Sequence, residues 1–194
     1  FLAMAARYKL WYNQVARPDL LTKLQLKNVH QVPRIEQISV SASTNVTTSQ
    51  LNHPVPAAFA LELITGRTAQ LTRVRKGNAR YKVRQGFLEG AKVNLRGEDM
   101  WNFLDRLVTQ VMPRIPDFNG LSSKGFDGNG NYALGIRDWG LFLELDSQHS
   151  NLSNMASARG FGVLINTSAK TDEEAKLLLS AMRVPFAQSE QGEQ

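Results

Sequence analysis

The sequence contains no cysteine, which excludes disulfide bonds and zinc sites built from thiolates. Histidine is scarce too: only His30, His53 and His149 are present, and none has a nearby nucleophile or a metal-ligand spacing. Apolar runs are short, and no window approaches the roughly 18 consecutive apolar residues that a membrane-spanning helix needs. We therefore expect surface or packing roles for the histidines, no metal site and no membrane span.

Motifs for catalysis and nucleotide binding are equally sparse. The adjacent carboxylates Glu98 and Asp99 diverge on a helix, so matching the positive N-terminal end of that helix explains them better than acid/base chemistry. The run from Asp127 begins like a calcium loop, but Tyr132 occupies the position of the required glycine. No Walker phosphate loop or dinucleotide fingerprint occurs. The sequence therefore predicts a protein that is not an enzyme and needs no cofactor.

What the sequence does contain is an excess of positive charge. Its 194 residues include 23 Lys and Arg against 17 Asp and Glu, a formal net charge of +6. This balance favours a polyanionic partner, with nucleic acid first. With 42% hydrophobic residues the chain can bury one core, so we expect a single domain over residues 1–186 and a disordered polar tail at 187–194.

The positive charge is concentrated in one segment. No acidic residue occurs between Glu62 and Glu89. The cations in that interval are Arg67, Arg73, Arg75, Lys76, Arg80, Lys82 and Arg84. Gly77 and Asn78 lie in the middle of the run, which predicts two strands joined by an exposed basic turn.

The expected helices follow from apolar spacing and from helix-end signals. Residues 8–26 have helical spacing, with an interruption at Pro18 that starts a second helical piece. A helix is expected at 57–64, after two prolines and before a glycine, and another from Glu98 to Pro113. Thr171 and Glu174 have the spacing of a capping box, which predicts the start of a last helix.

The expected strands follow from alternation of apolar and polar residues. They are placed at 38–43, 80–84, 91–96 and 161–167, with a further buried strand at 141–145. Residues 113–140 are expected to form a long irregular loop and residues 146–157 a polar surface insertion. This order predicts an α+β fold: a mainly antiparallel sheet with helices packed on one face, the other face and the loops being basic and RNA-facing.

The residues expected to bind RNA lie on the basic segment or on the polar face of the strands. They are Ser41, Arg67, Arg73, Arg75, Lys76, Arg80, Tyr81, Lys82, Arg84, Lys92, Asn94 and Arg96. On this hypothesis Arg and Lys contact phosphates, Tyr81 stacks on a base, and the serine face reaches sugar hydroxyls. Trp101 is expected in the core.

Six segments between residues 8 and 186 also resemble segments of a known protein family. They are QVPRIE at 31–36, KVRQG at 82–86, LRGE at 95–98, PRIPDFNGL at 113–121, FDGNGNY at 126–132 and AKTDEEA at 169–175. In this order they resemble the universal large-subunit ribosomal protein five family, which is associated with 5S ribosomal RNA.

The resemblance implies a structural protein of the central protuberance of the large ribosomal subunit, bound to 5S rRNA and to neighbouring large-subunit rRNA. It implies that one loop reaches toward tRNA in the peptidyl site, namely Arg75, Lys76, Gly77, Asn78, Ala79 and Arg80. It also implies a bridge to the small-subunit head, near its protein thirteen, through Arg114, Asp117, Asn119, Asp127 and Asn129.

The chain differs from the family at positions of the 5S contact. Ser41 stands for a usual Asn, Arg67 for Gln, Tyr81 for Phe and Asn94 for Thr. Either rearranged hydrogen bonds keep the RNA contact, or the 5S rRNA is divergent or missing, as in some organellar ribosomes. These differences, the polar insertion and an opening that resembles the stub of a targeting sequence favour the mitochondrial matrix over bacterial cytoplasm or plastid.

A different class of function also fits the residues. On this alternative the chain is a protein-interaction module that docks a partner through residues 113–140, and the basic face is only solvating. RNase treatment separates the two hypotheses, because it would leave the assembly of an interaction module intact.

Overall fold

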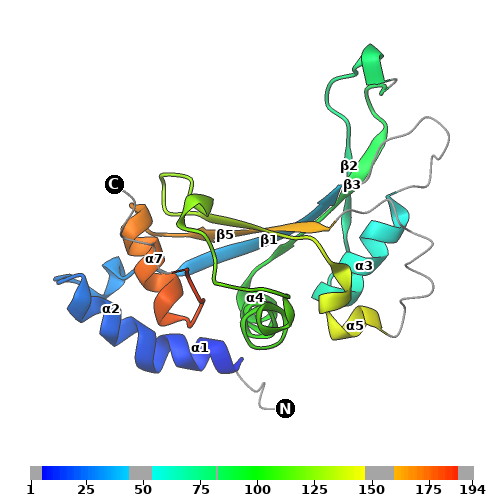
Figure 1. Cartoon of the computed structure of the whole chain (residues 1–194). Helices are drawn as coiled ribbons and strands as arrows, with labels where there is room; N and C mark the ends of the chain where they lie inside the picture. The colour runs from blue at the N-terminus through cyan, green and yellow to red at the C-terminus, as the bar shows by residue number, and fades with distance from the viewer. Residues whose placement is uncertain (1–5, 44–53, 82, 147–159, 188–194) are drawn as a thin grey trace, which may run out of the picture. The chain divides into compact units, whose positions relative to one another are not determined.

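The computed structural model describes residues 6–43, 54–81, 83–146 and 160–187. Its strands are β1 (Ile35–Ser43), β2 (Gln70–Arg73), β3 (Leu88–Leu95), β4 (Tyr132–Ile136) and β5 (Phe161–Thr167). They form a five-stranded antiparallel sheet in the order β2-β3-β1-β5-β4, and helices pack against it (Figure 1). The predicted α+β class is confirmed.

The helical elements are of three kinds. The α-helices are α1 (Arg7–Trp11), α2 (Arg17–Lys23), α3 (Val55–Thr65), α4 (Gly97–Arg106), α5 (Leu143–Asp146) and α7 (Asp172–Ala181). The π-helical turns are η1 (Tyr12–Ala16) and η4 (Leu107–Val111). The 3₁₀ turns are η2 (Val29–Gln31), η3 (Ala79–Tyr81), η5 (Met112–Arg114), η6 (Ser123–Gly125) and η7 (Trp139–Leu141).

Contacts within the chain group into two compact units. Unit 1 comprises residues 1–37, 96–134 and 164–194, and unit 2 comprises residues 38–95 and 135–163. The single domain over residues 1–186 stays a prediction. From residue 188 on, the tail lies outside the described residues.

Unit 2 is built on the antiparallel pair of β1 and β3. Their buried residues alternate with exposed ones, so Val40 lies opposite Val93 in the core and Ser41 opposite Lys92 on the exposed side. α3 packs against β3 and against α5. The predicted start and end signals of α3 are confirmed. Prolines lie at its start, and Gly66, with a left-handed backbone at φ 68°, ends it.

Unit 1 holds the N-terminal helices, α4 and α7. α1 packs against α4 and α2 against α7. The predicted second helical piece at Pro18 is confirmed, since Pro18 lies in the first turn of α2. The helical run is not interrupted there, however, because α1, η1 and α2 follow one another without a break. Proline cannot donate to the carbonyl four residues earlier, and the wider π-helical turn immediately before it lets the chain stay helical.

The ends of α4 and α7 follow the sequence signals. Glu98 and Asp99 lie in the first turn of α4, and Trp101 is buried as expected. Thr171 caps α7 by accepting a hydrogen bond from Glu174 N (3.4 Å). The reciprocal bond of the capping box shifts by one residue, because Glu174 Oε2 accepts from Lys170 N (3.0 Å) instead of from Thr171 N.

Three expected elements differ in the structure. β4 lies inside the stretch predicted as a loop, with Tyr132 and Ile136 buried at its two ends. Residues 141–145, predicted as a strand, belong to η7 and the short helix α5, because a brief apolar run does not distinguish the two states. The strand expected at 80–84 is replaced by η3 and an isolated bridge. The insertion predicted at 146–157 lies, from residue 147 on, outside the described residues.

Candidate nucleic-acid interface

A polar row crosses the exposed side of the β1–β3 pair in unit 2. Ser39 lies opposite Asn94 and Ser41 opposite Lys92 in the register of the two strands. Ser39 Oγ donates to Asn94 Oδ1 at 2.9 Å, which fixes the amide of Asn94. Three of the predicted RNA-binding residues, Ser41, Lys92 and Asn94, are thus brought together. Ser39 completes the row and was not singled out from the sequence, although the alternation of serines in β1 indicated it.

The two strands approach each other closely because β3 carries a glycine. A Cβ on Gly90 would lie 2.1 Å from the carbonyl oxygen of Ala42 and 2.9 Å from the Cα of Ser43. At the same place Ser41 and Lys92 line a hollow of about 490 Å³ together with Ser43, Thr72 and Gly162. Hydroxyl groups and the Lys92 ammonium group therefore line this hollow together with apolar residues, Arg137 and the acidic Glu89.

The basic segment forms a hairpin, residues 74–87, between β2 and β3. Val74 and Phe87 close its base, since Val74 N donates to Phe87 O at 2.8 Å. Asn78 and Val83 exchange two backbone bonds near the tip, at 2.8 and 3.1 Å. The hairpin extends from β2 and β3 away from α3 (Figure 1). The chain is thus held in a defined projecting ribbon.

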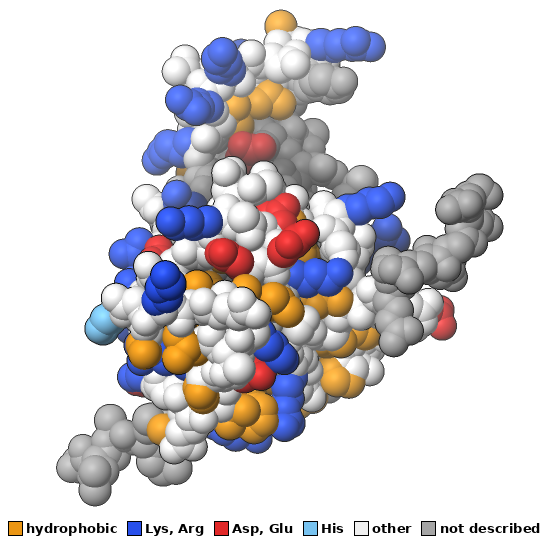
Figure 2. All heavy atoms as spheres, turned by 90° about the vertical axis from the view of Figure 1, so that its left-hand side faces the viewer, with side chains coloured by type: hydrophobic (Ala, Val, Ile, Leu, Met, Phe, Trp, Pro, Cys, Tyr) orange, Lys and Arg blue, Asp and Glu red, His pale blue; other side chains and the backbone are white. Residues whose placement is uncertain are grey.

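The side chains of the hairpin are strongly cationic. Arg73, at the end of β2, and the hairpin residues Arg75, Lys76, Arg80 and Arg84 are exposed. Figure 2 shows Lys and Arg side chains gathered at the end of the molecule where Figure 1 places the hairpin. Lys82 lies outside the described residues. Because no acid occurs between Glu62 and Glu89, the cations of this ribbon have no acidic neighbour in sequence.

Two other predicted RNA-binding residues lie elsewhere. Arg67 is exposed in the connection between α3 and β2, where its backbone N–H donates to Thr65 Oγ1 at 3.3 Å. Arg96 follows β3 and belongs to unit 1, where it donates two hydrogen bonds to Gln37 Oε1, from Nε at 2.9 Å and from Nη2 at 2.6 Å. The structure thus assigns most of the predicted residues to unit 2 and Arg96 to unit 1.

The loop before β4, in unit 1, is held by two aspartates. Asp127 accepts from Asn131 Nδ2 at 2.8 Å and from the backbone N–H groups of Asn129 and Asn131. These bonds, with the Asn131 side chain first, lower the pKa of Asp127 below its ordinary value of 3.8. Asp172, in the first turn of α7, accepts from Gly128 N at 3.1 Å and from Gly130 N at 3.0 Å. The loop is therefore ordered by polar contacts.

The residues predicted to form a bridge lie on this loop and before it. Arg114, Asp117, Asn119, Asp127 and Asn129 are all exposed. Asp117 has a left-handed backbone, with φ 53°, a conformation that Asp tolerates better than most residues. The resemblance grouped these residues, and the structure places all of them in unit 1.

Within the part of the chain that the structure describes, no group of three or more His, Asp or Glu side chains could hold a metal ion. No helix among those residues is long and apolar enough to cross a membrane. The fold and the surface therefore define a basic α+β protein that exposes a polar strand face and a cationic hairpin.

Comparison with known proteins identifies the family. Residues 89–186 match the model for the C-terminus of the ribosomal L5 protein family. The chain is 41% identical over 182 residues to the large ribosomal subunit protein uL5 of Fusobacterium nucleatum, covering 93% of this chain and 96% of that protein. It is 40% identical over 183 residues to the protein of the same name from Pediococcus pentosaceus, covering 94% and 99%. A Synechococcus uL5 is also 40% identical, over 184 residues, covering 95% and 99%.

The chain belongs to the uL5 family of large-subunit ribosomal proteins. Its role is structural and not enzymatic, and its place is the ribosome. The resemblance drawn from the sequence is thereby confirmed.

Proposed function

We propose that the chain binds ribosomal RNA through unit 2, with the polar row of β1 and β3 and the basic hairpin as contact surfaces. The observation that carries the proposal is the division of the paired residues of β1 and β3 into a buried apolar side and a polar side on which Ser41, Lys92 and Asn94 are exposed. The apolar side of these strands packs in the core, whereas the polar side can contact only solvent or a binding partner.

The chemistry of the surface suits an RNA backbone. Arg and Lys neutralise phosphates and release counterions, which supplies most of the affinity of such interfaces. Serine hydroxyls and the amide of Asn94 can bond to sugar hydroxyls and base edges, contacts that distinguish RNA from a simple polyanion. The proposed partners are 5S rRNA and neighbouring large-subunit rRNA in the central protuberance. The replacements at Ser41, Arg67, Tyr81 and Asn94 make the 5S contact the part most in need of a test.

The test compares two variants that lose equal charge. Arg75→Gln, Lys76→Gln and Arg80→Gln together neutralise the hairpin, and Lys124→Gln, Lys170→Gln and Lys176→Gln remove three cations from unit 1. Binding to purified bacterial 5S rRNA is measured across a range of KCl concentrations. For the hairpin variant we expect the slope of log K against log salt to fall by about 2 to 3, at roughly 0.7–0.9 per lost phosphate contact. An unchanged slope for this variant would contradict the proposal.

The hairpin tip is also proposed to contact tRNA in the peptidyl site. Its support is the projecting ribbon that exposes Arg75, Lys76 and Arg80 around Gly77 and Asn78. A photo-crosslinker placed at Lys76 of the protein in programmed ribosomes is expected to label peptidyl-site tRNA. Labelling of rRNA alone would contradict the proposed tRNA contact but would be consistent with the proposed binding to rRNA.

The ordered loop of unit 1 is proposed to bridge to the small-subunit head, near its protein thirteen. Its support is that Asp127 and Asp172 accept hydrogen bonds from residues 128–131, so Asp127 and Asn129 lie on an ordered loop. Arg114, Asp117 and Asn119 are exposed in the segment before this loop. Reversing the charges of Arg114 and Asp117 together is expected to weaken subunit association in sucrose gradients. Normal association would contradict the bridge.

The protein-interaction module is the competing function, and the same ordered loop favours it. It differs in predicting that the basic face binds nothing. Digestion of native assemblies with RNase separates the two: release of the chain supports the RNA proposal, and retention with a protein partner supports the module. The mitochondrial location stays a prediction; the relatives named above are bacterial and lend it no support.

A further inference from the structure

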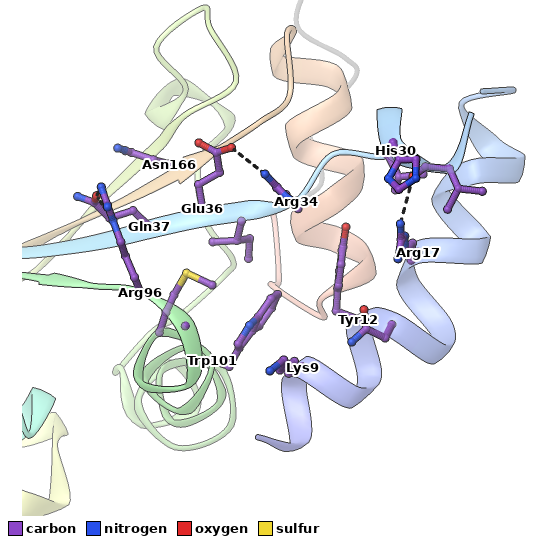
Figure 3. A pocket seen from close by; sticks show the side chains of 16 residues that line it. Lys9, Tyr12, Arg17, His30, Arg34, Glu36, Gln37, Arg96, Trp101 and Asn166 are labelled. Atoms are coloured by element: carbon purple, nitrogen blue, oxygen red, sulfur yellow. Dashed lines mark hydrogen bonds and ion pairs between the residues drawn. The ribbon is translucent and has the colours of Figure 1, made fainter. Parts of the chain in front are cut away.

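A second basic surface lies in unit 1. A cleft of about 690 Å³ lies among the helical run from α1 to α2, η2 with the start of β1, and the start of α4. Residues that carry or can carry positive charge line it on all of these segments (Figure 3): Lys9, Arg17, His30, Arg34 and Arg96. Glu36 is the acidic residue among those that line it. All of these residues belong to unit 1.

The arginines of this cleft are held in place mainly by neutral or distant partners. Arg96 donates its two hydrogen bonds to the side-chain oxygen of Gln37, and Arg17 Nη2 donates to the carbonyl of Val29 at 3.4 Å. Amide and carbonyl oxygens orient a guanidinium group without cancelling its charge. Arg34 Nη2 lies 3.8 Å from Glu36 Oε1, and both side chains are more than half exposed, so this ion pair contributes little.

Lys9 is the cation of the cleft that has a close acidic partner. Its Nζ bonds to Glu98 Oε1, and the backbone N–H of Ala6 donates to Glu98 Oε2 at 3.0 Å. These bonds, Lys9 first, lower the pKa of Glu98. Lys9 therefore links the N-terminal helix to α4, whereas Arg17, Arg34 and Arg96 carry the charge that the cleft offers to a ligand.

Two buried aromatic rings line the cleft. Tyr12 and Trp101 stack on each other with ring centroids 5.5 Å apart, and both are buried. The Tyr12 hydroxyl donates to the carbonyl of Pro33 at 2.9 Å, and burial raises the pKa of Tyr12. Because both rings are buried, the cleft offers no exposed aromatic face for a base. It offers guanidinium groups, and the amides of Asn13 and Asn166 also line it.

We propose that this cleft binds the sugar–phosphate backbone of RNA, with Arg17, Arg34 and Arg96 on the phosphates. The proposal rests on the RNA-binding function proposed above and adds a contact in unit 1 that is separate from the strand face and hairpin of unit 2. A cleft of this size lies within the range of about 300–1000 Å³ typical of sites that enclose ligands, so a nucleotide-sized segment fits. Two contacts on one chain make binding to a single RNA multivalent, so loss of either lowers the affinity.

The experiment measures binding to purified bacterial 5S rRNA and, separately, to large-subunit rRNA from the same ribosomes. Arg17→Gln with Arg34→Gln is compared with the equally charged Lys124→Gln with Lys170→Gln. With either RNA or both, we expect the cleft variant to bind roughly 10- to 50-fold more weakly at 100 mM salt and its salt slope to fall by about 1.5, as two lost phosphate contacts predict. The control variant is expected to keep the wild-type slope. Arg17→Lys with Arg34→Lys keeps the charge and is expected to retain most of the affinity.

The outcomes separate this proposal from the function on which it rests. Weakening by the hairpin variant together with wild-type binding by the cleft variant, to both RNAs, overturns the cleft site and leaves the unit 2 interface. Wild-type binding by both variants overturns both. Equal loss in the Gln and Lys cleft variants, with a lowered melting temperature, assigns the arginines to folding and also overturns the site.

Discussion

Ser41 and Lys92 are register partners across the β1–β3 pair, and both side chains lie on its exposed side. A hydroxyl group beside an ammonium group can contact a sugar and its phosphate at once. The buried neighbours Val40 and Val93 hold this pair in place, because a slip of one residue would move every polar side chain into the core. The same alternation therefore builds the core and presents the proposed interface.

The first prediction concerns Lys92. Lys92→Gln is expected to weaken binding to rRNA and to lower its salt slope by roughly 0.7–0.9, the contribution of one phosphate contact. The melting temperature should stay within error of wild type because Lys92 is exposed. Lys176→Gln, on α7, is the matched control and should leave the salt slope unchanged. Equal slopes for all three proteins would exclude Lys92 from the interface.

The second prediction concerns the close approach of β1 and β3. Gly90→Ala places a methyl group 2.1 Å from Ala42 O, so the strands must separate, and we expect the free energy of unfolding to fall by about 1–3 kcal/mol. Gly135→Ala is the matched control, since no atom lies within 4 Å of its added Cβ and its φ is not in the left-handed region. Urea unfolding measures both. A Gly90→Ala protein as stable as the control would show that the strands tolerate the methyl group.

The third prediction is a pH dependence that originates at Asp127. Its folded pKa lies below 3.8, so its contribution to stability is complete above the unfolded pKa, near about 3.9, and is lost as the pH falls through the lowered folded value. Asp127→Asn removes the charge. We expect the variant to melt below wild type at pH 7 and the difference to close in acid. Asp117→Asn is the control, and a difference for Asp127→Asn that persists unchanged below pH 3 would contradict this assignment.

The fourth prediction concerns the start of α7. Thr171→Ala removes the acceptor of the Glu174 N–H and is expected to lower the free energy of unfolding by about 1 kcal/mol. Thr171→Ser keeps the hydroxyl oxygen and should lower the free energy of unfolding by only a few tenths of that amount. Thermal unfolding of both proteins measures the difference. If serine and alanine destabilise the protein equally, the side-chain cap makes no contribution.

Much of the fold could be predicted from local signals. β1, β3 and β5 have one buried face, so apolar and polar residues alternate along them, and α3 carries prolines at its start and a glycine at its end. β4 was missed because it has only five residues, includes Gly135 and follows a glycine-rich turn. Together these features are typical of a loop. Its place in the sheet depends on tertiary pairing that no short window contains.

The proposed interface was predictable where charge or alternation marked it, as at Lys92 and in the hairpin. The cleft of unit 1 was not, because Arg17, Arg34 and Arg96 come from three segments far apart in the sequence. No spacing rule connects them, and each alone looks like an ordinary exposed arginine. Only packing of the N-terminal helices against α4 brings such side chains around one cavity.

The central claim is that this ribosomal protein acts by binding rRNA, and crosslinking in native cell extract tests it most directly. The extract is crosslinked and sedimented through a gradient at high salt, and the RNA attached to the chain is sequenced. We expect the chain in the large-subunit fraction, with attached sequences from 5S rRNA, from neighbouring large-subunit rRNA, or from both. Sedimentation with the large subunit but without enriched rRNA, the chain being retained only through protein, would contradict the account.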